Sequence, residues 1–369
     1  MCAAPAIPAL AAVEFPQELA GSRLLTRFGS ALDGGVLAAM QRAVDLALMP
    51  SPEELPELLA SAEQMLDPAL QGRPERFFAF PEDSLRALEV RERGRRSLPG
   101  GAAISRELVY AYPEHGQEQP ARRETLLLEH WVHRPAYPRA TVVTAHGFTM
   151  GQPRIDALVL FARQWFRRGL DVALLTLPHH GARTPADSRF SGERFAVPHV
   201  ARLSEAVRQA IFELRLLTLW LREGVGGPVG LLGLSLGGYL TALAAGLYED
   251  LDFAIPLVPP VCIGDLAWRF FQRSRHYKQG ASPAFSQDEL RSLYRVHSPL
   301  AHPLRMPRER LLIIAGRGDR IVPPEHPHAL WLHWQKPRIH WFSGSHLAPF
   351  GRGRIVAEIE AHLRGLGVL

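Results

Sequence analysis

The chain is poor in cysteine and in long apolar runs. Among its 369 residues only Cys2 and Cys262 are cysteines, so no disulfide framework beyond a single bridge is possible, and a reducing, cytoplasmic location is expected. No uninterrupted apolar run reaches the roughly 18 residues that a membrane-spanning helix needs. The apolar stretch 3–13 lacks a preceding basic region and contains Pro5 and Pro8, which indicates a tail rather than a signal peptide.

The excess of positive over negative charge is also small. Lys and Arg total 42 against 37 Asp and Glu, giving a net charge of +5, and the arginine clusters are interleaved with glutamate. So weak a field favours a solvated surface over a nucleic-acid interface. With 47% hydrophobic and 21% charged residues, the composition is that of an ordinary globular protein.

Several cofactor motifs are missing. The sequence contains no Gly-x-x-x-x-Gly-Lys-Ser/Thr and no His-Glu-x-x-His, and the glycines at 224–230 precede an apolar run instead of following one. The adjacent histidines His179 and His180 point apart in any regular backbone, and no cysteine or carboxylate follows at ligand spacing. We therefore expect neither a cofactor nor a metal.

The second half of the chain alternates between buried strands and amphipathic helices. Five short runs are apolar at every position, which is typical of parallel strands covered on both faces; they are Thr141–Ala145, Val172–Leu177, Val229–Leu234, Phe253–Val258 and Leu311–Ala315. Helical apolar spacing follows at 155–166, 200–221 and 355–363, and a last strand is expected at 338–342. This alternation predicts an α/β fold with a doubly wound, mostly parallel sheet.

The remaining segments divide the chain further. We predict a flexible tail at 1–21, a helical N-terminal extension at 22–100 with an Arg- and Gly-rich linker at 91–101, and one large domain at 101–369. Within that extension, helices are expected at Leu32–Met49 and from Ser51 towards Leu66. The large domain opens with two antiparallel strands, Glu107–Tyr112 and Glu124–His133, and carries an insertion at about 260–307 over the carboxyl edge of the sheet. Three roles stay open for the extension, namely packing on the sheet, extending the insertion, or forming a homodimer.

Ser235 lies in the pattern Gly233-Leu-Ser-Leu-Gly237, between a predicted strand and a predicted helix. A serine at so tight a strand-to-helix turn is presented at its tip, and the flanking positions must lack side chains for the two elements to pass. The pattern is common by chance, but its position between strand and helix indicates a nucleophile; the alternative is a packing turn with an idle serine.

An activated serine needs a base and an acid that orients the base. Asp319 follows a predicted buried strand in a Gly-rich loop, and His346 follows the last strand, which gives the chain order Ser, Asp, His. Asp265 is the second candidate for the acid, and His340 is a poorer base because it lies inside a strand. The alternatives are a turn aspartate and a solvated loop histidine.

An oxyanion needs backbone N–H donors. We expect one from Leu236, directly after the serine, and one from Phe148, in the loop after the first parallel strand. In the same loop Gly147 lets the backbone turn its amides inward. His146 is expected to brace this loop.

The chain resembles the α/β-hydrolase superfamily over roughly residues 105–369. The resemblance rests on four motifs in this order along the chain: His146-Gly147-Phe148, the Ser235 turn, the Asp319 loop and Gly344-Ser345-His346. The resemblance implies Ser235 as nucleophile, His346 as general base and acid, and Asp319 as its orienting carboxylate. It also implies that the insertion is a cap.

The segment Pro178-His179-His180-Gly181-Ala182-Arg183 resembles a poorly characterised bacterial esterase-like branch of that superfamily. In that position His179, His180 and Arg183 could line a substrate pocket. Arg183, Arg189 or Arg194 could bind an acidic group of the substrate. The favoured interpretation is that backbone contacts hold this loop in place.

Together these features predict a serine hydrolase that cleaves a carboxylic ester of a small or medium-sized molecule through an acyl-enzyme on Ser235. The same three residues would also serve a thioesterase, an amidase or an acyltransferase, and a non-catalytic binding module is the alternative of a different class.

Overall fold

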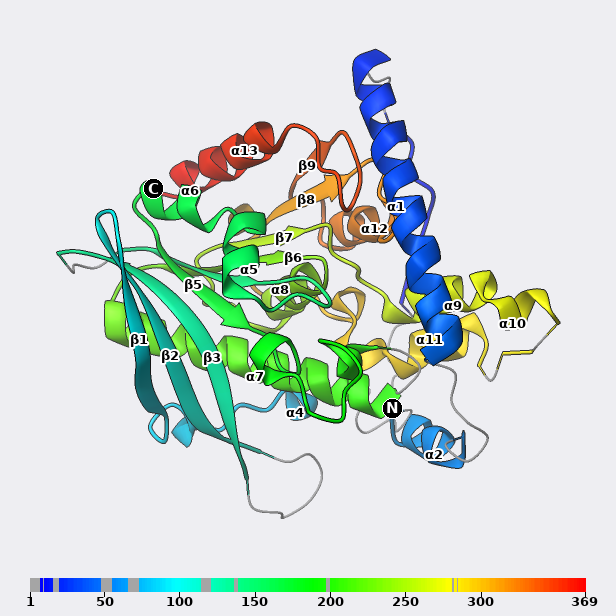
Figure 1. Ribbon diagram of the computed structural model, residues 1–369, viewed down its shortest axis with the longest axis horizontal. Coiled ribbons are helices and arrows are strands. Elements are labelled where there is room, and N and C mark those ends of the chain that lie inside the picture. Colours follow the sequence, from blue (N-terminus) through cyan, green and yellow to red (C-terminus); the bar gives the residue numbers. More distant parts are fainter. Residues whose placement is uncertain are drawn as a thin grey trace.

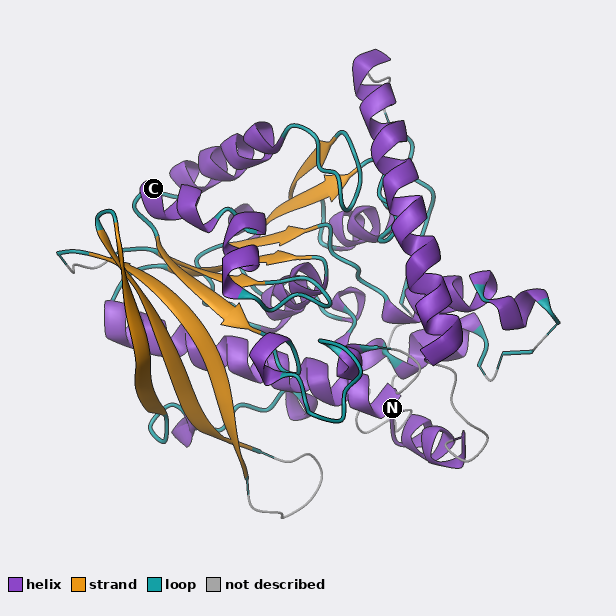
Figure 2. Cartoon of the chain, in the orientation of Figure 1, coloured by secondary structure: helices purple, strands orange, loops and turns teal. Residues whose placement is uncertain are grey.

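The computed structural model describes residues 7–8, 10–15, 20–47, 55–65, 73–113, 121–135, 139–196, 200–280, 282–283 and 285–369. Its centre is one nine-stranded sheet in the order β1-β2-β3-β5-β4-β6-β7-β8-β9, covered by helices on both faces (Figure 2). This is the α/β architecture that the alternation of strands and helices predicts.

Six strands form the parallel part of the sheet. They are β4 (Thr141–Ala145), β5 (Asp171–Thr176), β6 (Val229–Leu234), β7 (Ala254–Leu257), β8 (Leu312–Gly316) and β9 (Arg338–Phe342). All five residues of β4 are buried, as are all of β5 and β8, because helices cover both faces. The strands predicted from continuous apolar runs are confirmed to within a residue or so at each end.

Three long antiparallel strands extend the sheet at its other side. They are β1 (Glu89–Leu98), β2 (Gly101–Tyr112) and β3 (Arg122–His133), and β3 pairs antiparallel with β5. The prediction of a linker at 91–101 is wrong, because β1 and its turn into β2 occupy it. As an edge strand, β1 is exposed along nearly its whole length, so it carries charges in place of an apolar alternation.

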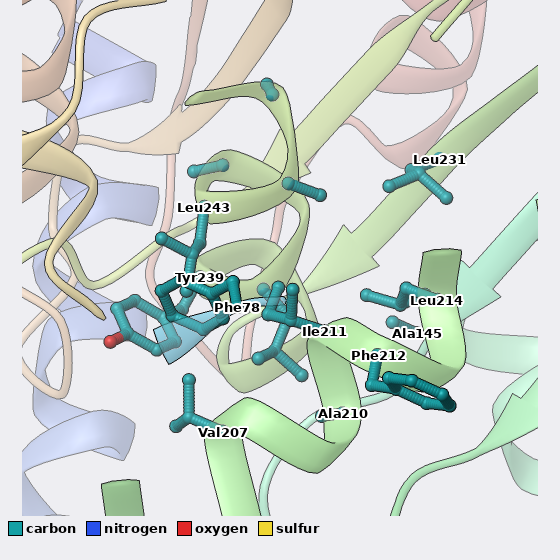
Figure 3. Close-up of a cluster of buried hydrophobic side chains, with 14 of the residues drawn as sticks. Phe78, Ala145, Val207, Ala210, Ile211, Phe212, Leu214, Leu231, Tyr239 and Leu243 are labelled. Carbon is teal, nitrogen blue, oxygen red and sulfur yellow. The ribbon is translucent and has the colours of Figure 1, made fainter. Parts of the chain in front are cut away.

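The helices bury one apolar stripe each against the sheet. On one face lie α7 (Val200–Val225), α8 (Leu236–Leu247) and α12 (Glu325–His333); Figure 3 shows Ile211 and Leu214 of α7 among side chains of the sheet and of α8. The other face is covered by α6 (Ala162–Arg167) and α13 (Arg352–Gly365). The single helix predicted at 155–166 is two helices, α5 (Pro153–Val159) and α6, because Phe161 adopts a left-handed conformation between them.

The N-terminal helices are α1 (Ala20–Ala47), α2 (Leu55–Met65) and the short α4 (Pro74–Phe77). The first begins well before the predicted Leu32, whereas the predicted helix start at Ser51 lies outside the described residues. In Figure 1, α1 lies alongside the loops that follow β8 and β9, so part of the extension packs at the edge of the sheet.

The predicted insertion contains α9 (Ile263–Arg273), α10 (Arg275–Lys278) and α11 (Gln287–Leu293). A capping box starts α11: the Glu289 amide donates to Ser286 Oγ and the Ser286 amide donates to Glu289 Oε2, as the Ser-x-x-Glu spacing predicts. No helix in the described part of the chain is long and apolar enough to cross a membrane.

Candidate active site

Ser235 lies at the junction between β6 and α8 with φ 55° and ψ −111°. This backbone conformation is strained for a residue with a side chain, and such strain collects at functional sites. The Ser235 amide donates to Leu257 O at 2.9 Å and its carbonyl accepts from the Tyr239 amide at 2.8 Å, so the turn is fixed on both sides.

The two glycines that flank the serine are required because the backbone passes too close to them for a side chain to fit. A Cβ on Gly233 would lie 2.0 Å from the Gly237 oxygen, and a Cβ on Gly237 would lie 2.0 Å from the Ala145 oxygen. Both distances are far inside van der Waals contact, so no other residue type fits the turn. The structure thus supplies the steric reason for the Gly-x-Ser-x-Gly spacing.

Asp319 and His346 are joined directly. The His346 Nδ1 lies 2.7 Å from Asp319 Oδ2, and the two side chains are only 8% and 2% exposed. The other carboxylate oxygen, Oδ1, accepts from the amides of Ile321 and Val322 at 3.0 and 2.7 Å. The acid is therefore held on one side by its own loop and presents its second oxygen to the imidazole, as an orienting carboxylate does.

The charge around His346 favours its protonated form. Burial by itself would lower the pKa of His346, but the attraction of the Asp319 carboxylate, its hydrogen bond and a smaller contribution from Asp33 raise that pKa above its usual value. A general base of this kind accepts a proton readily near neutral pH.

Ser235, Asp319 and His346 follow β6, β8 and β9, whose carboxyl ends lie at one edge of the parallel sheet. Among the described residues no hydrogen bond joins the Ser235 hydroxyl to the His346 imidazole. Catalytic hydrogen bonds are often long in the absence of substrate. The contact between nucleophile and base therefore stays a prediction.

The loop after β4 packs directly on the serine. A Cβ on Gly147 would lie 3.7 Å from the Ser235 Cβ, so this glycine gives the loop its close approach. Within the described structure, the backbone N–H groups of Phe148 and Leu236 have no acceptor, which is what the proposed oxyanion donors require. Their role in catalysis remains a prediction.

His146 braces this loop. It is fully buried, its Nδ1–H donates to Gly147 O at 2.9 Å, and its Nε2 accepts from the Leu177 amide at 3.1 Å. Burial lowers the pKa of His146 to about 3, with a smaller effect of the neighbouring His180, so the ring is neutral and joins β4 to β5.

The sequence matches known proteins over most of its length. An uncharacterized protein of Mycobacterium tuberculosis, Rv2627c of strain H37Rv, is 31% identical over 323 residues, covering 80% of this chain and 71% of the relative. The sequence profile of the family described as alpha/beta hydrolase domain containing 18 matches residues 123–268. The chain belongs to the α/β-hydrolase superfamily.

Solved structures agree with this hydrolase-superfamily assignment at the level of the fold. Acetyl xylan esterase 1 from Thermoanaerobacterium sp. JW/SL YS485 superposes with a TM-score of 0.54 at 14% identity, covering 84% of this chain and 93% of that one. Acetyl xylan esterase from Paenibacillus sp. R4 gives a TM-score of 0.53 at 16% identity, covering 79% and 98%.

Arg183 forms an ion pair with a buried acid. Its guanidinium forms a two-point ion pair with Glu213, at 2.7 and 2.6 Å, and donates to Thr176 O at 2.9 Å. Glu213 is fully buried on α7 and also accepts hydrogen bonds from Tyr110 OH and from Gln209. These contacts attach the loop after β5 to α7 and β2, which supports a structural role for Arg183.

The neighbouring histidines differ in exposure. His180 is fully buried, with Nδ1 2.8 Å from Pro178 O, while His179 and Arg183 line a pocket of about 410 Å³ together with residues of β2, β3 and α7. None of the three proposed catalytic residues lines that pocket. Burial lowers the pKa of both histidines to about 4, so neither is charged at neutral pH.

The other candidates of the sequence analysis are also paired. Arg189 and Arg194 form ion pairs with Glu193 and Asp187. The second candidate acid, Asp265, accepts from Arg291 at 2.7 Å. No cluster of three or more potential metal ligands occurs within the described ranges.

Two acids of this region were missed by the sequence analysis. One is Glu213, which a search for a polar residue beside an apolar helical stripe would find. The other is Asp33 on α1, which contacts the loop of His346.

Proposed function

We propose that the protein is a serine hydrolase that cleaves a carboxylic ester of a small or medium-sized molecule. The observation that carries the proposal is the buried pair of Asp319 and His346 at the same edge of the sheet as the strained Ser235 turn. The backbone amides of Phe148 and Leu236, which have no acceptor among the described residues, add to it.

The reaction follows from these positions. The Ser235 hydroxyl attacks the acyl carbon and its proton passes to His346 Nε2, while Asp319 stabilises the imidazolium through Nδ1. The amides of Phe148 and Leu236 bind the developing oxyanion. The alcohol leaves with the proton from His346, and water, deprotonated by the same base, then releases the acid and regenerates the serine.

Ester hydrolysis is favoured over other acyl transfers by analogy of fold alone, since the two superposed structures are described as acetyl xylan esterases. Acetyl esters are therefore the first substrates to test. The proposed chemistry is that of a carboxylesterase-like enzyme, and it uses no cofactor or metal.

A fluorophosphonate probe tests the nucleophile without knowledge of the substrate. We expect one covalent adduct, located by mass spectrometry on Ser235, and no adduct in Ser235→Ala. If the wild type stays unlabelled, the protein is a binding module. If Ser235→Ala labels as strongly as the wild type, another residue is the nucleophile. A series of p-nitrophenyl esters of increasing acyl length then measures hydrolysis and pocket depth, and Ser235→Ala should reduce it by at least about 1000-fold.

A further inference from the structure

The helix α1 is packed against both loops that carry the proposed base and acid. The Gly344 amide donates to Thr26 Oγ1 at 3.3 Å, and a Cβ on Gly29 would lie 3.0 Å from the Ser345 amide nitrogen. On the other loop, a Cβ on Gly318 would lie 2.8 Å from the Thr26 carbonyl oxygen. Glycine inside a helix is less favourable than alanine, so the close approach explains Gly29.

Asp33 is the centre of this contact. Its Oδ2 accepts from the main-chain amides of Arg320 and His346 at 3.0 and 2.9 Å, and its Oδ1 accepts from Ser345 Oγ and the Leu347 amide at 2.8 and 3.0 Å. The residue is completely buried. One carboxylate oxygen thus bridges the residue that follows Asp319 and the backbone of His346 itself.

All four donors to Asp33 are neutral groups, and no ion pair of Asp33 occurs among the described residues. A buried carboxylate without a cationic partner costs free energy unless its hydrogen bonds compensate. An uncompensated negative charge also acts on its surroundings, and the imidazole of His346 is the titratable group on the loop that Asp33 holds.

We propose that Asp33 is a positioning residue of the active site, which fixes the loops of Asp319 and His346 relative to each other and stabilises the imidazolium form of His346 by its charge. This inference rests on the proposed function. It assigns a part of the site to a helix of the N-terminal extension, some 300 residues away along the chain.

The electrostatic part follows from the groups that face His346. Among the described residues the carboxylates of Asp319 and Asp33 both raise the pKa of His346 against the effect of burial. The positive charge of Arg269 interacts with the carboxylate of Asp319 and with the guanidinium of Arg320. Removing the Asp33 charge therefore lowers the pKa of His346, and the base stays neutral to lower pH.

The test compares the full-length wild type with Asp33→Asn, an isosteric change that removes the charge. The rate of fluorophosphonate labelling at Ser235 is measured from pH 5 to pH 9. We expect labelling at pH 8 to slow by about 10- to 100-fold, because a small displacement of a catalytic group has effects of this size. We also expect the acid limb of the profile to move to lower pH.

Asp171→Asn is a matched control. Asp171 is a buried aspartate at the start of β5, away from the carboxyl edge, and it accepts from the amide and Nδ1 of His133 at 3.0 and 2.8 Å. This variant should lose stability while its labelling rate and pH profile match those of the wild type. A general loss of packing would slow both variants, whereas a positioning role affects Asp33→Asn alone.

The titration of His346, followed by NMR with labelled histidine, provides a readout that needs no catalysis. A lower pKa in Asp33→Asn supports the proposal, and an unchanged pKa together with unchanged labelling overturns it. If the wild type does not label at all, the proposed function fails, and the NMR titration still decides the role of Asp33.

Should Asp33→Asn fail to fold, Ser345→Ala removes one donor and keeps the carboxylate charge. We expect labelling to slow by less than tenfold with the acid limb in place. A wild-type rate at every pH in this variant overturns the proposal.

Discussion

Two of the buried carboxylates, Glu213 and Asp33, differ in how their charge is balanced. Glu213 faces the guanidinium of Arg183 in a two-point ion pair, so its charge is neutralised where it lies. Asp33 is surrounded by neutral N–H and O–H donors only, as far as the structure describes its partners. Both fasten a loop, but of the two only Asp33 acts by its charge on His346, the proposed base.

The comparison separates two uses of a buried acid. A neutralised acid such as Glu213 contributes to stability and to the geometry of the loop after β5. An acid held by dipoles alone also contributes an electrostatic potential to the proposed base. Mutations of the two groups should therefore differ in kind, with stability changing for one and the pH profile for the other.

Asp319→Asn should have the largest effect on activity. The amide cannot hold the imidazole in the tautomer that accepts the serine proton, and the loss in kcat is on the order of 10⁴-fold. Labelling kinetics and hydrolysis of p-nitrophenyl acetate measure it. Asp265→Asn is the control, since that acid is paired with Arg291 and should leave the rate within a few-fold. The reverse result would make Asp265 the catalytic acid.

Glu213→Gln should have the largest effect on stability. It leaves the buried guanidinium of Arg183 without a counter-charge, which costs about 3–5 kcal/mol. Denaturant unfolding measures the loss. At a temperature where the variant is folded, the acid limb of its labelling profile should coincide with that of the wild type. A displaced limb would contradict the division of roles between Glu213 and Asp33.

Tyr110→Phe should have the smallest effect. It removes the hydroxyl that donates to Glu213 and accepts from Gln209, but it leaves the ion pair with Arg183 and the hydrogen bond from Gln209 to Glu213 in place. Of the two hydrogen bonds lost, the one to the charged Glu213 contributes about 1.5–3 kcal/mol, and Gln209 keeps Glu213 as an acceptor. Thermal and denaturant unfolding of both variants provide the ranking, and a larger loss than in Glu213→Gln would show that the neutralisation by Arg183 is not the main contribution.

The parallel strands and the serine turn could be predicted from sequence because their signals are local. Continuous apolar runs indicate β4 and β6. The tight turn at the serine requires glycine at Gly233 and Gly237, and this pattern is visible in the sequence. The edge strand β1 could not be predicted, because a strand that is exposed on both faces shows no alternation of apolar and polar residues.

The role of Asp33 was hidden for a different reason. With a helix expected from Leu32, an aspartate in the next position looks like an ordinary acid of a first helical turn. The structure starts α1 at Ala20, so Asp33 is a mid-helix residue in a position that aspartate disfavours. Its partners come from the other end of the chain, and a contact over so long a separation leaves no pattern in the surrounding residues.

The order of synthesis gives the contact between α1 and the last loop a consequence of its own. Asp33 leaves the ribosome 312 and 313 residues before Ser345 and His346. A nascent chain can assemble its first strands and its serine turn, but the proposed base is neither present nor held until the chain has been made past His346. Termination between Phe342, the last residue of β9, and His346 should therefore yield an inert protein with most of its sheet already formed.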